Sequence, residues 1–271
     1  MFDSHVHSHH SHDSKQSVEE ICQAAIEKGL KGVAVTDHVD MWFLEERFTV
    51  REIKKCIENV RVMKEKYRDQ IKLLQGIEIA ETDYDENVAK EILEFTDYDV
   101  VIGSVHCVEF EDYRDGYSVY PFGAPTSDAR ILAFLKLYFD RLRTMVDKMD
   151  FDVLAHLNCP LRYINGKYKR GIDDKLFSEQ IDAILLAIIQ KGVALEINTS
   201  GVGDYYGDWL PGEWIVARYY ALGGRLVTIG SDAHAGAMIG NAFEATKEML
   251  RRIGFSEYHY YEKRKPIAVG L

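Results

Sequence analysis

The sequence predicts an α/β fold in which strands and helices alternate around a mainly parallel sheet. Short apolar runs rich in β-branched residues recur about seven times, and most of the gaps between them repeat apolar residues at the three- and four-residue spacing of an amphipathic helix. Such alternation is typical of parallel sheets. With 271 residues, 46% of them hydrophobic, the chain can bury the core of one (β/α) barrel. We therefore expect a single domain over residues 1–271.

Each element follows from local signals. The first helix begins after Ser17, which forms a capping box with Glu20, and it ends at Gly29. The other elements are expected where the apolar periodicity is clear, with strands at 2–7, 32–38, 71–79, 99–106, 153–157, 193–198 and 226–231, and helices at 51–66, 85–95, 128–149, 174–191, 212–222 and 241–252.

The stretch 108–127 has neither periodicity. It is rich in tyrosine and proline and follows the expected strand that ends in His106. Long ordered loops in compact domains often carry function, so this stretch is expected either to cover a site as a lid or to pack on the rim of the barrel. The sequence favours neither alternative.

Composition disfavours several classes of protein. The formal net charge of −11 opposes binding to a phosphodiester backbone. No apolar run approaches the length of a membrane helix, and the first residues lack the apolar segment of a signal peptide. The four cysteines contain no CxxC pair, which favours reduced thiols. We expect a cytoplasmic protein that binds neither nucleic acid nor membranes.

Polar residues that can bind a metal ion stand at the end of every expected strand. In chain order they are His5 and His7, Asp37 and His38, Glu78, His106, His156, Glu196 and Asn198, and Asp232 and His234. In a closed parallel barrel the carboxyl ends of the strands surround a single mouth. Residues far apart in the sequence are therefore expected to meet there.

A single histidine after a strand is more often structural than a metal ligand, so the inference depends on the joint placement. The spacing of His5 and His7 puts both imidazoles on one face of a strand. Imidazole and carboxylate ligands suit zinc, iron or manganese, whereas calcium and magnesium favour oxygen ligands. The sequence therefore predicts a metal-dependent hydrolase.

These residues resemble the PHP (polymerase and histidinol phosphatase) superfamily over nearly the whole chain. The matching motifs are His5-Val-His7, Thr-Asp37-His38, Gly-Ile-Glu78, Ser-Val-His106, Ala-His156-Leu-Asn and Ser-Asp232-Ala-His234. Within the superfamily, residues 155–163 and 195–201 look most like the histidinol-phosphate phosphatases. The resemblance implies a distorted seven-stranded (β/α) barrel that hydrolyses L-histidinol phosphate in histidine biosynthesis.

The resemblance also implies a site for two or three divalent cations. One cation would be bound by His5, His7, Glu78 and Asp232, a second by Glu78, His106 and His156, and a third by His38, His234 and one residue after His7. Asp13 is our choice for this last ligand, because Ser11-His12-Asp13-Ser14 resembles a Ser-x-Asp-Ser variant of the family. His12 is the alternative.

Such a site suits phosphate ester hydrolysis, because two cations that share Glu78 can activate one water molecule. Arg162 is the candidate phosphate ligand, since guanidinium binds phosphate in a bidentate way, and its alternative role is a salt bridge on the barrel rim. The candidate proton donors to the leaving group are Asp37 and His234. Asn198 and Ser200 are candidate substrate contacts, although Asn198 can equally hold its own loop.

One departure from the family concerns the substrate. Histidinol phosphatases usually have a basic residue after the segment Asn198-Thr199-Ser200-Gly201, but here the acids Asp204 and Asp208 follow. Three explanations stay open. A cation from Lys167, Lys169 or Arg170 substitutes, the natural ester is a different one, or the acids favour the amine of histidinol.

The expected partners are a small phosphorylated substrate and inorganic phosphate as the product. The alternative functions are a phosphodiesterase or nuclease of the same superfamily and a phosphatase for another small ester. A non-catalytic metal-binding protein is disfavoured, because every expected ligand position is filled.

Overall fold

The computed structural model describes residues 1–44, 50–111 and 113–271. The strands are β1 (Phe2–Val6), β2 (Gly32–Val35), β3 (His38–Asp40), β4 (Lys72–Ala80), β5 (Val100–Ser104), β6 (Val153–Leu154), β7 (Ala194–Asn198), β8 (Val227–Gly230), β9 (Glu257–Glu262) and β10 (Lys265–Gly270). The α-helices are α1 (Val18–Glu27), α2 (Val50–Tyr67), α3 (Glu86–Leu93), α4 (Asp128–Lys148), α5 (Ser178–Lys191), α6 (Glu213–Ala221) and α7 (Phe243–Ile253). Shorter helical segments are η1 (Met41–Phe43), η2 (Arg162–Lys167), η3 (Asp174–Phe177) and η4 (Gly236–Met238). Within the described ranges, no helix is both long and apolar enough to cross a membrane.

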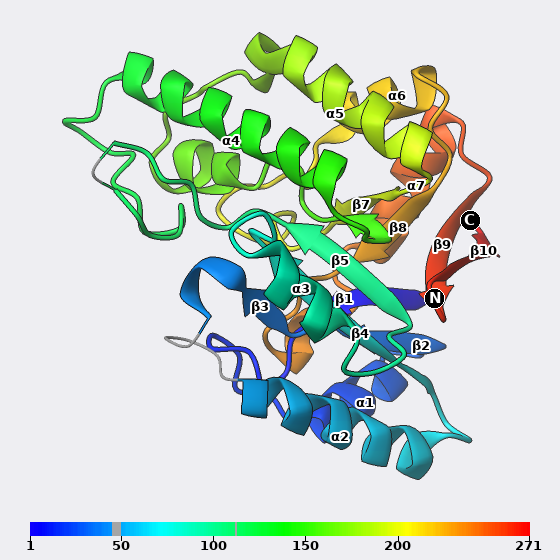
Figure 1. Cartoon of the computed structure of the whole chain (residues 1–271). Coiled ribbons are helices and arrows are strands. Elements are labelled where there is room, and N and C mark those ends of the chain that lie inside the picture. The colour runs from blue at the N-terminus through cyan, green and yellow to red at the C-terminus, as the bar shows by residue number, and fades with distance from the viewer. Residues whose placement is uncertain (45–49, 112) are drawn as a thin grey trace.

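The strands form one mainly parallel sheet. Its order is β1-β2-β4-β5-β6-β7-β8-β9-β10, with the short β3 paired to β4 outside this path. The hairpin of β9 and β10 is antiparallel, and the pairings from β1 to β9 are parallel. Helices α4, α5 and α6 lie on one side of the strands and α1 and α2 on the other (Figure 1). The predicted α/β class with a parallel sheet is therefore confirmed.

The expected number of seven strands is too low, because the sheet has ten strands in the described part of the chain. The strand predicted at 32–38 divides into β2 and β3 where the chain turns at Asp37, whose carboxylate accepts a hydrogen bond from the Ser8 N–H at 2.6 Å. The aromatic segment around His259, where no strand was expected from the sequence, forms the buried part of β9 and pairs with β8. Its alternating pattern is short and was masked by tyrosines on both faces.

Strand β1 also contacts the chain that follows β8. Val6 and Ala233 form a parallel bridge, the His7 N–H donates to the Ala233 carbonyl at 3.0 Å, and the Asp232 N–H donates to the His5 carbonyl at 2.8 Å. Near this contact, the buried Asp3 carboxylate accepts the N–H groups of Ser231 and Gly240, each at 2.9 Å. The residues just after β1 and just after β8 are therefore neighbours.

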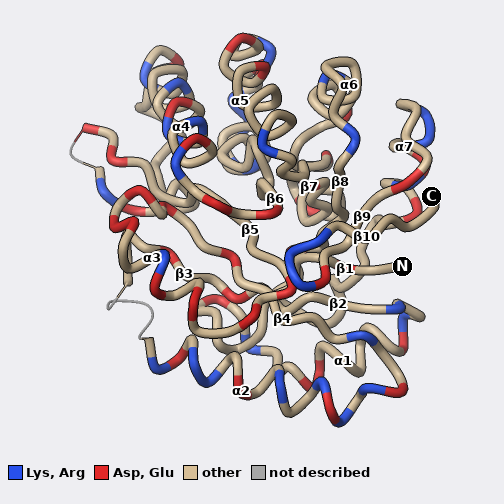
Figure 2. Tube along the Cα trace, turned by 45° about the vertical axis from the view of Figure 1, so that its right-hand side comes forward, with Lys and Arg blue, Asp and Glu red and all other residues tan. Residues whose placement is uncertain are grey.

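Local signals in the sequence explain the best-predicted helix. Ser17 Oγ accepts the Glu20 N–H at 3.1 Å, and the Glu20 carboxylate accepts the Ser17 N–H at 2.7 Å, so the expected capping box is confirmed. The helix ends before Gly29, whose φ of +70° suits a residue without Cβ. Residues of both charges are spread along the outer helices (Figure 2), and the Arg252–Glu213 pair at 2.7 Å joins α7 to α6.

The stretch 108–127 packs on the core and also reaches the carboxyl ends of the strands. Asp112 in this stretch lies outside the described residues. Three aromatic side chains of the stretch pack around Phe134 of α4. The ring centroids of Phe110, Tyr120 and Phe122 lie 5.7, 5.1 and 5.1 Å from that of Phe134. The same stretch contributes Tyr117 and Ser118 to a cavity beside the strand ends. Both expected roles, rim packing and a wall over the site, are therefore compatible with its position.

Candidate metal centre

Glu78, on β4, lies at the centre of the cluster of ligand-type side chains. Its Oε2 is 2.7 Å from His38 Nδ1 and 3.2 Å from His5 Nε2. Its Oε1 is 3.0 Å from His156 Nε2 and 3.3 Å from His106 Nε2. One fully buried carboxylate thus faces imidazoles that follow or lie on β1, β3, β5 and β6.

His5 and His7 project from the end of β1 toward Asp232, which follows β8. The two Nε2 atoms are 2.9 Å apart, and His7 Nε2 is 3.1 Å from Asp232 Oδ1. The pairing of β1 with the chain after β8 creates this proximity. Asp232 adopts a φ of +51°, and His156 a φ of +21°, which are strained values for residues other than glycine. Such strain often occurs at functional sites.

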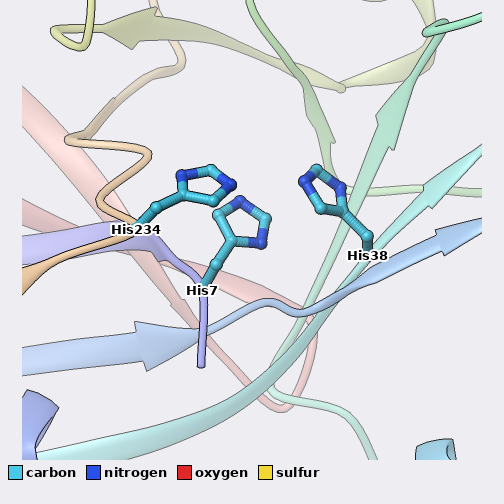
Figure 3. Close-up of side chains that lie close together, drawn as sticks. All are labelled: His7, His38 and His234. Atoms are coloured by element: carbon cyan, nitrogen blue, oxygen red, sulfur yellow. The ribbon is translucent and has the colours of Figure 1, made fainter. Parts of the chain in front are cut away.

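A second group of imidazoles forms around His7. Figure 3 shows the rings of His7, His38 and His234 gathered close together from three separate segments. The His7 ring stacks on those of His38 and His234, with centroid separations of 4.1 and 4.4 Å. Asp13 Oδ2 is 3.1 Å from His234 Nε2 and 3.8 Å from His38 Nε2. The His12 ring also lies beside that of His38, with 5.7 Å between the ring centroids. The structure therefore brings Asp13 to this group.

The residues present fit a metal centre. Among the described residues, three overlapping groups have donor atoms within 4.8 Å of one another, namely His7, His38 and His234, then His5, His7 and Asp232, and then His38, Glu78 and His106. Buried imidazole nitrogens that face one another around a carboxylate form the donor set typical of zinc, iron or manganese. His7 and His38 are each shared between two groups, so the grouping differs from three separate ligand sets.

Burial and neighbouring charges shift the pKa values of these groups. Burial would raise the pKa of Glu78, but the charges of His38 and His5 hold it well below its usual value. Burial would lower the pKa of His38, but the Glu78 carboxylate raises it to about 9. Burial lowers the pKa of His7 to about 3, with help from His38 and His234. His7 is therefore neutral at pH 7, which is the form that binds a metal ion.

Two further carboxylates orient the histidines from behind. Glu196 Oε1 is 2.6 Å from His5 Nδ1, and Asp40 Oδ1 is 2.9 Å from His106 Nδ1. Carboxylates in this position fix the ring orientation and tautomer of a metal-binding histidine. Gly230 leaves the space for Glu196, because a Cβ at Gly230 would lie 2.4 Å from Glu196 Oε1.

Asp40 was missed in the sequence, and Glu196 was noted only as one of several strand-end residues. A signal for Asp40 was present, because it follows His38 with the two-residue period that places both side chains on one face of a strand.

A cavity opens beside the cluster and is lined by His234, Asp13, Tyr117 and Arg162 among others. Arg162 begins η2 and donates from Nη1 to Ser200 Oγ at 3.1 Å. Ser200 Oγ in turn donates to Asn198 Oδ1 at 2.7 Å. The expected substrate contacts therefore lie together next to the metal-binding residues.

Asp37 does not line this cavity, although it is adjacent to His38. Its carboxylate accepts hydrogen bonds from the Ser8 N–H and Oγ, each at 2.6 Å, from Ser11 Oγ at 2.7 Å and from the Cys56 thiol at 3.0 Å. Burial would raise the pKa of Asp37, but these donors hold it below its usual value. The geometry therefore disfavours Asp37 as a proton donor, and it assigns this residue to the folding of the loop after β1.

The basic residues considered as substitutes for the missing family cation point elsewhere. Lys169 Nζ donates to the Tyr205 carbonyl at 3.2 Å, and Arg170 Nη2 donates to the Thr126 carbonyl at 2.9 Å. Lys167 Nζ lies 5.3 Å from the centre of the Tyr168 ring. Among the described residues that line the cavity, Arg162 is the only lysine or arginine.

The model of the PHP domain matches residues 3–200, which is most of the chain. The chain belongs to the PHP domain family. This PHP protein is 30% identical over 271 residues to a probable histidinol-phosphatase of Thermotoga maritima, with all of both chains covered. It is also 30% identical over 268 residues to a probable histidinol-phosphatase of Clostridium acetobutylicum, covering 97% of this chain and 98% of the relative.

A solved structure agrees with this PHP fold. Histidinol phosphate phosphatase from Lactococcus lactis, complexed with zinc, L-histidinol and phosphate, matches with a TM-score of 0.83 at 23% identity, covering 98% of each chain. The superfamily predicted from the motifs, with histidinol phosphatases as similar proteins, is thus confirmed. The PHP protein described here is a metal-dependent phosphatase.

Proposed function

We propose that this PHP protein is a histidinol-phosphate phosphatase, which converts L-histidinol phosphate and water into L-histidinol and inorganic phosphate during histidine biosynthesis. The observation that carries the proposal is the Glu78 cluster of imidazoles beside a cavity with one guanidinium, that of Arg162. The full-length similarity to histidinol phosphatases supports the choice of substrate. The soluble substrate and product are consistent with the expected cytoplasmic location.

The proposed metal ligands are the sets that the family resemblance implies. His5, His7, Glu78 and Asp232 would hold one cation, and Glu78 with His106 and His156 would hold a second. A third would be held by His38, His234 and Asp13. Zinc, iron or manganese bound there would lower the pKa of a water molecule for attack on phosphorus and neutralise phosphate oxygens.

The residues of the chain supply the rest of the chemistry. Arg162 binds the phosphate, and Ser200 and Asn198 hold the guanidinium beside Asp232. His234 lines the cavity and is the proposed proton donor to the leaving alkoxide when only two cations are bound. A third cation would be bound by the His234 imidazole, which could then no longer donate a proton. The number of bound cations therefore decides whether His234 is the proton donor.

We also infer that the sheet closes into a distorted barrel that forms one domain. The bridge between Val6 and Ala233, which joins the first strand to the chain after β8, supports this inference. Closure brings ligands from both ends of the sheet path to one mouth, as barrel enzymes require.

The test is phosphate release by the manganese-loaded protein from L-histidinol phosphate, other small phosphomonoesters and a bis-aryl phosphodiester. We expect a kcat/KM for L-histidinol phosphate about a hundredfold above that for the other monoesters, equal to roughly 2.7 kcal/mol of discrimination. Equal rates on all monoesters would reject this substrate and keep the phosphatase. Preference for the diester would reject the proposal in favour of a phosphodiesterase.

A further inference from the structure

Asp204 contacts the only arginine that faces the cavity within the described part of its lining. Its Oδ2 accepts hydrogen bonds from Arg162 Nε at 2.8 Å and from Arg162 Nη2 at 2.7 Å. The Arg162 side chain is 22% exposed and the Asp204 side chain 19% exposed, so the ion pair lies largely away from solvent. From the geometry we propose that Asp204 is a positioning residue that turns the Arg162 guanidinium toward the phosphate. This inference rests on the proposed function.

The guanidinium group explains how such an orientation works. Arginine has five N–H groups in one plane, one on Nε and two on each Nη atom. Asp204 occupies the edge formed by Nε and Nη2. Each Nη atom carries two hydrogens, so one N–H on Nη2 and one on Nη1 remain after the contacts with Asp204 and with Ser200 Oγ. A pair of N–H groups on one guanidinium is the arrangement that binds two phosphate oxygens. The acid thus selects which edge of Arg162 is presented to the cavity.

A second contact fixes the distance between this edge and the metal-binding residues. Arg162 Nη1 donates to Ser200 Oγ at 3.1 Å, and Ser200 Oγ donates to Asn198 Oδ1 at 2.7 Å. Asn198 Nδ2 donates to Asp232 Oδ2 at 3.3 Å. Asp204 and Ser200 therefore hold the guanidinium from two directions, and one of these directions leads to a proposed metal ligand.

The acid has two opposing effects on phosphate binding. Its negative charge weakens the attraction between Arg162 and an anion, whereas its hydrogen bonds remove rotational freedom that the long arginine side chain would otherwise lose on binding. Arg162 is the only lysine or arginine in the described cavity lining. Lys169 and Arg170 donate their hydrogen bonds to backbone carbonyls elsewhere. Because the described lining has no second lysine or arginine to align the phosphate, we expect the orienting effect of Asp204 to outweigh the effect of its charge.

The first measurement is the inhibition constant of inorganic phosphate, with the KM and kcat for L-histidinol phosphate, in the metal-loaded Asp204→Ala protein. We expect the inhibition constant and KM to rise about tenfold, the size expected for loss of a charge-assisted hydrogen bond, with kcat changed less. Asp204→Asn keeps an acceptor without the charge, and its values should lie between those of Asp204→Ala and the unsubstituted protein. Asp69→Asn is the control, because Asp69 is an exposed acid that does not line the cavity. Its constants should stay within about twofold.

A double-substitution cycle separates positioning from a general effect on folding. If Asp204 acts through Arg162, adding Asp204→Ala to Arg162→Ala should weaken phosphate binding no further. Tighter phosphate binding in Asp204→Ala, an unchanged inhibition constant, or additive losses in the double variant would each overturn the proposal. Phosphate binding measured by calorimetry applies the same comparison without turnover. An unsubstituted protein that hydrolyses no ester would overturn the proposed function, while this binding comparison would still decide the role of Asp204.

Discussion

Asp40 orients His106, a proposed metal ligand, and is not itself a proposed ligand. Its contact with His106 Nδ1 at 2.9 Å leaves the other ring nitrogen directed at Glu78. An amide at this position keeps the shape of the side chain but removes the negative charge that raises the basicity of the imidazole.

We expect Asp40→Asn to weaken metal binding about tenfold to a hundredfold, because the orienting carboxylate of a ligand histidine is lost. The measurement is competition for zinc or manganese against a coloured chelator. Asp69→Asn, which changes an exposed acid of the same type, is the control. An affinity equal to that of the unsubstituted protein would show that Asp40 has no part in metal binding.

At the residue scale, the sequence predicts ligand types better than their supporting contacts. The spacing of His5 and His7 depends only on the period of a strand, so it can be recognised in one segment. The contact between Glu196 and His5 joins β7 to β1, and no spacing in the sequence encodes it. Asp37 was expected to donate a proton to the leaving group. Its hydrogen bonds with Ser8 and Ser11 join it instead to the loop after β1, and no spacing in the sequence encodes these contacts.

At the element scale, the aromatic stretch 108–127 has a packing role that can be measured separately from the site. Phe122 is fully buried against Phe134 of α4, whereas Val119 in the same stretch is 58% exposed. The same backbone thus carries one side chain in the core and one in solvent.

We expect Phe122→Ala to lower the free energy of unfolding by about 3–5 kcal/mol, through lost apolar contact and the cavity left behind. Val119→Ala should change it by less than about 0.5 kcal/mol. Urea unfolding followed by circular dichroism measures both. A small effect for Phe122→Ala would mean that the stretch is held by its backbone rather than by its rings.

The elements that the sequence did not reveal share a physical cause. β3 has three residues, which is too short for a two-residue period to be recognised, whereas the two-residue β6 lies within the strand expected at 153–157. η2 is a π-helix that begins at Arg162, two residues after Pro160, and no periodicity in the sequence predicts it. These irregular segments hold His38 and Arg162, so the least predictable backbone carries proposed functional residues, as π-helical turns often do.

At the scale of the whole molecule, the metal centre links ionisation to stability. The pKa of His38 rises from 6.5 to about 9 on folding, because the Glu78 carboxylate outweighs the effect of burial. The folded metal-free protein therefore binds a proton more tightly than the unfolded chain does. Stability from this proton is fully present below pH 6.5 and is lost as the pH rises through about 9.

We expect the free energy of unfolding of metal-free protein to fall by roughly 3 kcal/mol over this pH range from His38 alone. Saturating metal should abolish the decrease, because a bound cation displaces the proton. Denaturant unfolding at several pH values, with and without metal, tests this expectation. The variant His38→Gln should show a smaller slope, and an equal slope would assign the effect to other groups.

The pairing of β1 with the chain after β8 has a consequence for synthesis on the ribosome. His5 and His7 emerge long before Asp232 and His234, to which the folded protein joins them. At roughly 5–20 residues per second, the early histidines wait on the order of ten seconds or longer for their partners. During that time the nascent chain offers a cation only part of the donor set. Complete metal binding is therefore a late event, which follows the emergence of β8 and marks a chain whose two distant segments have met.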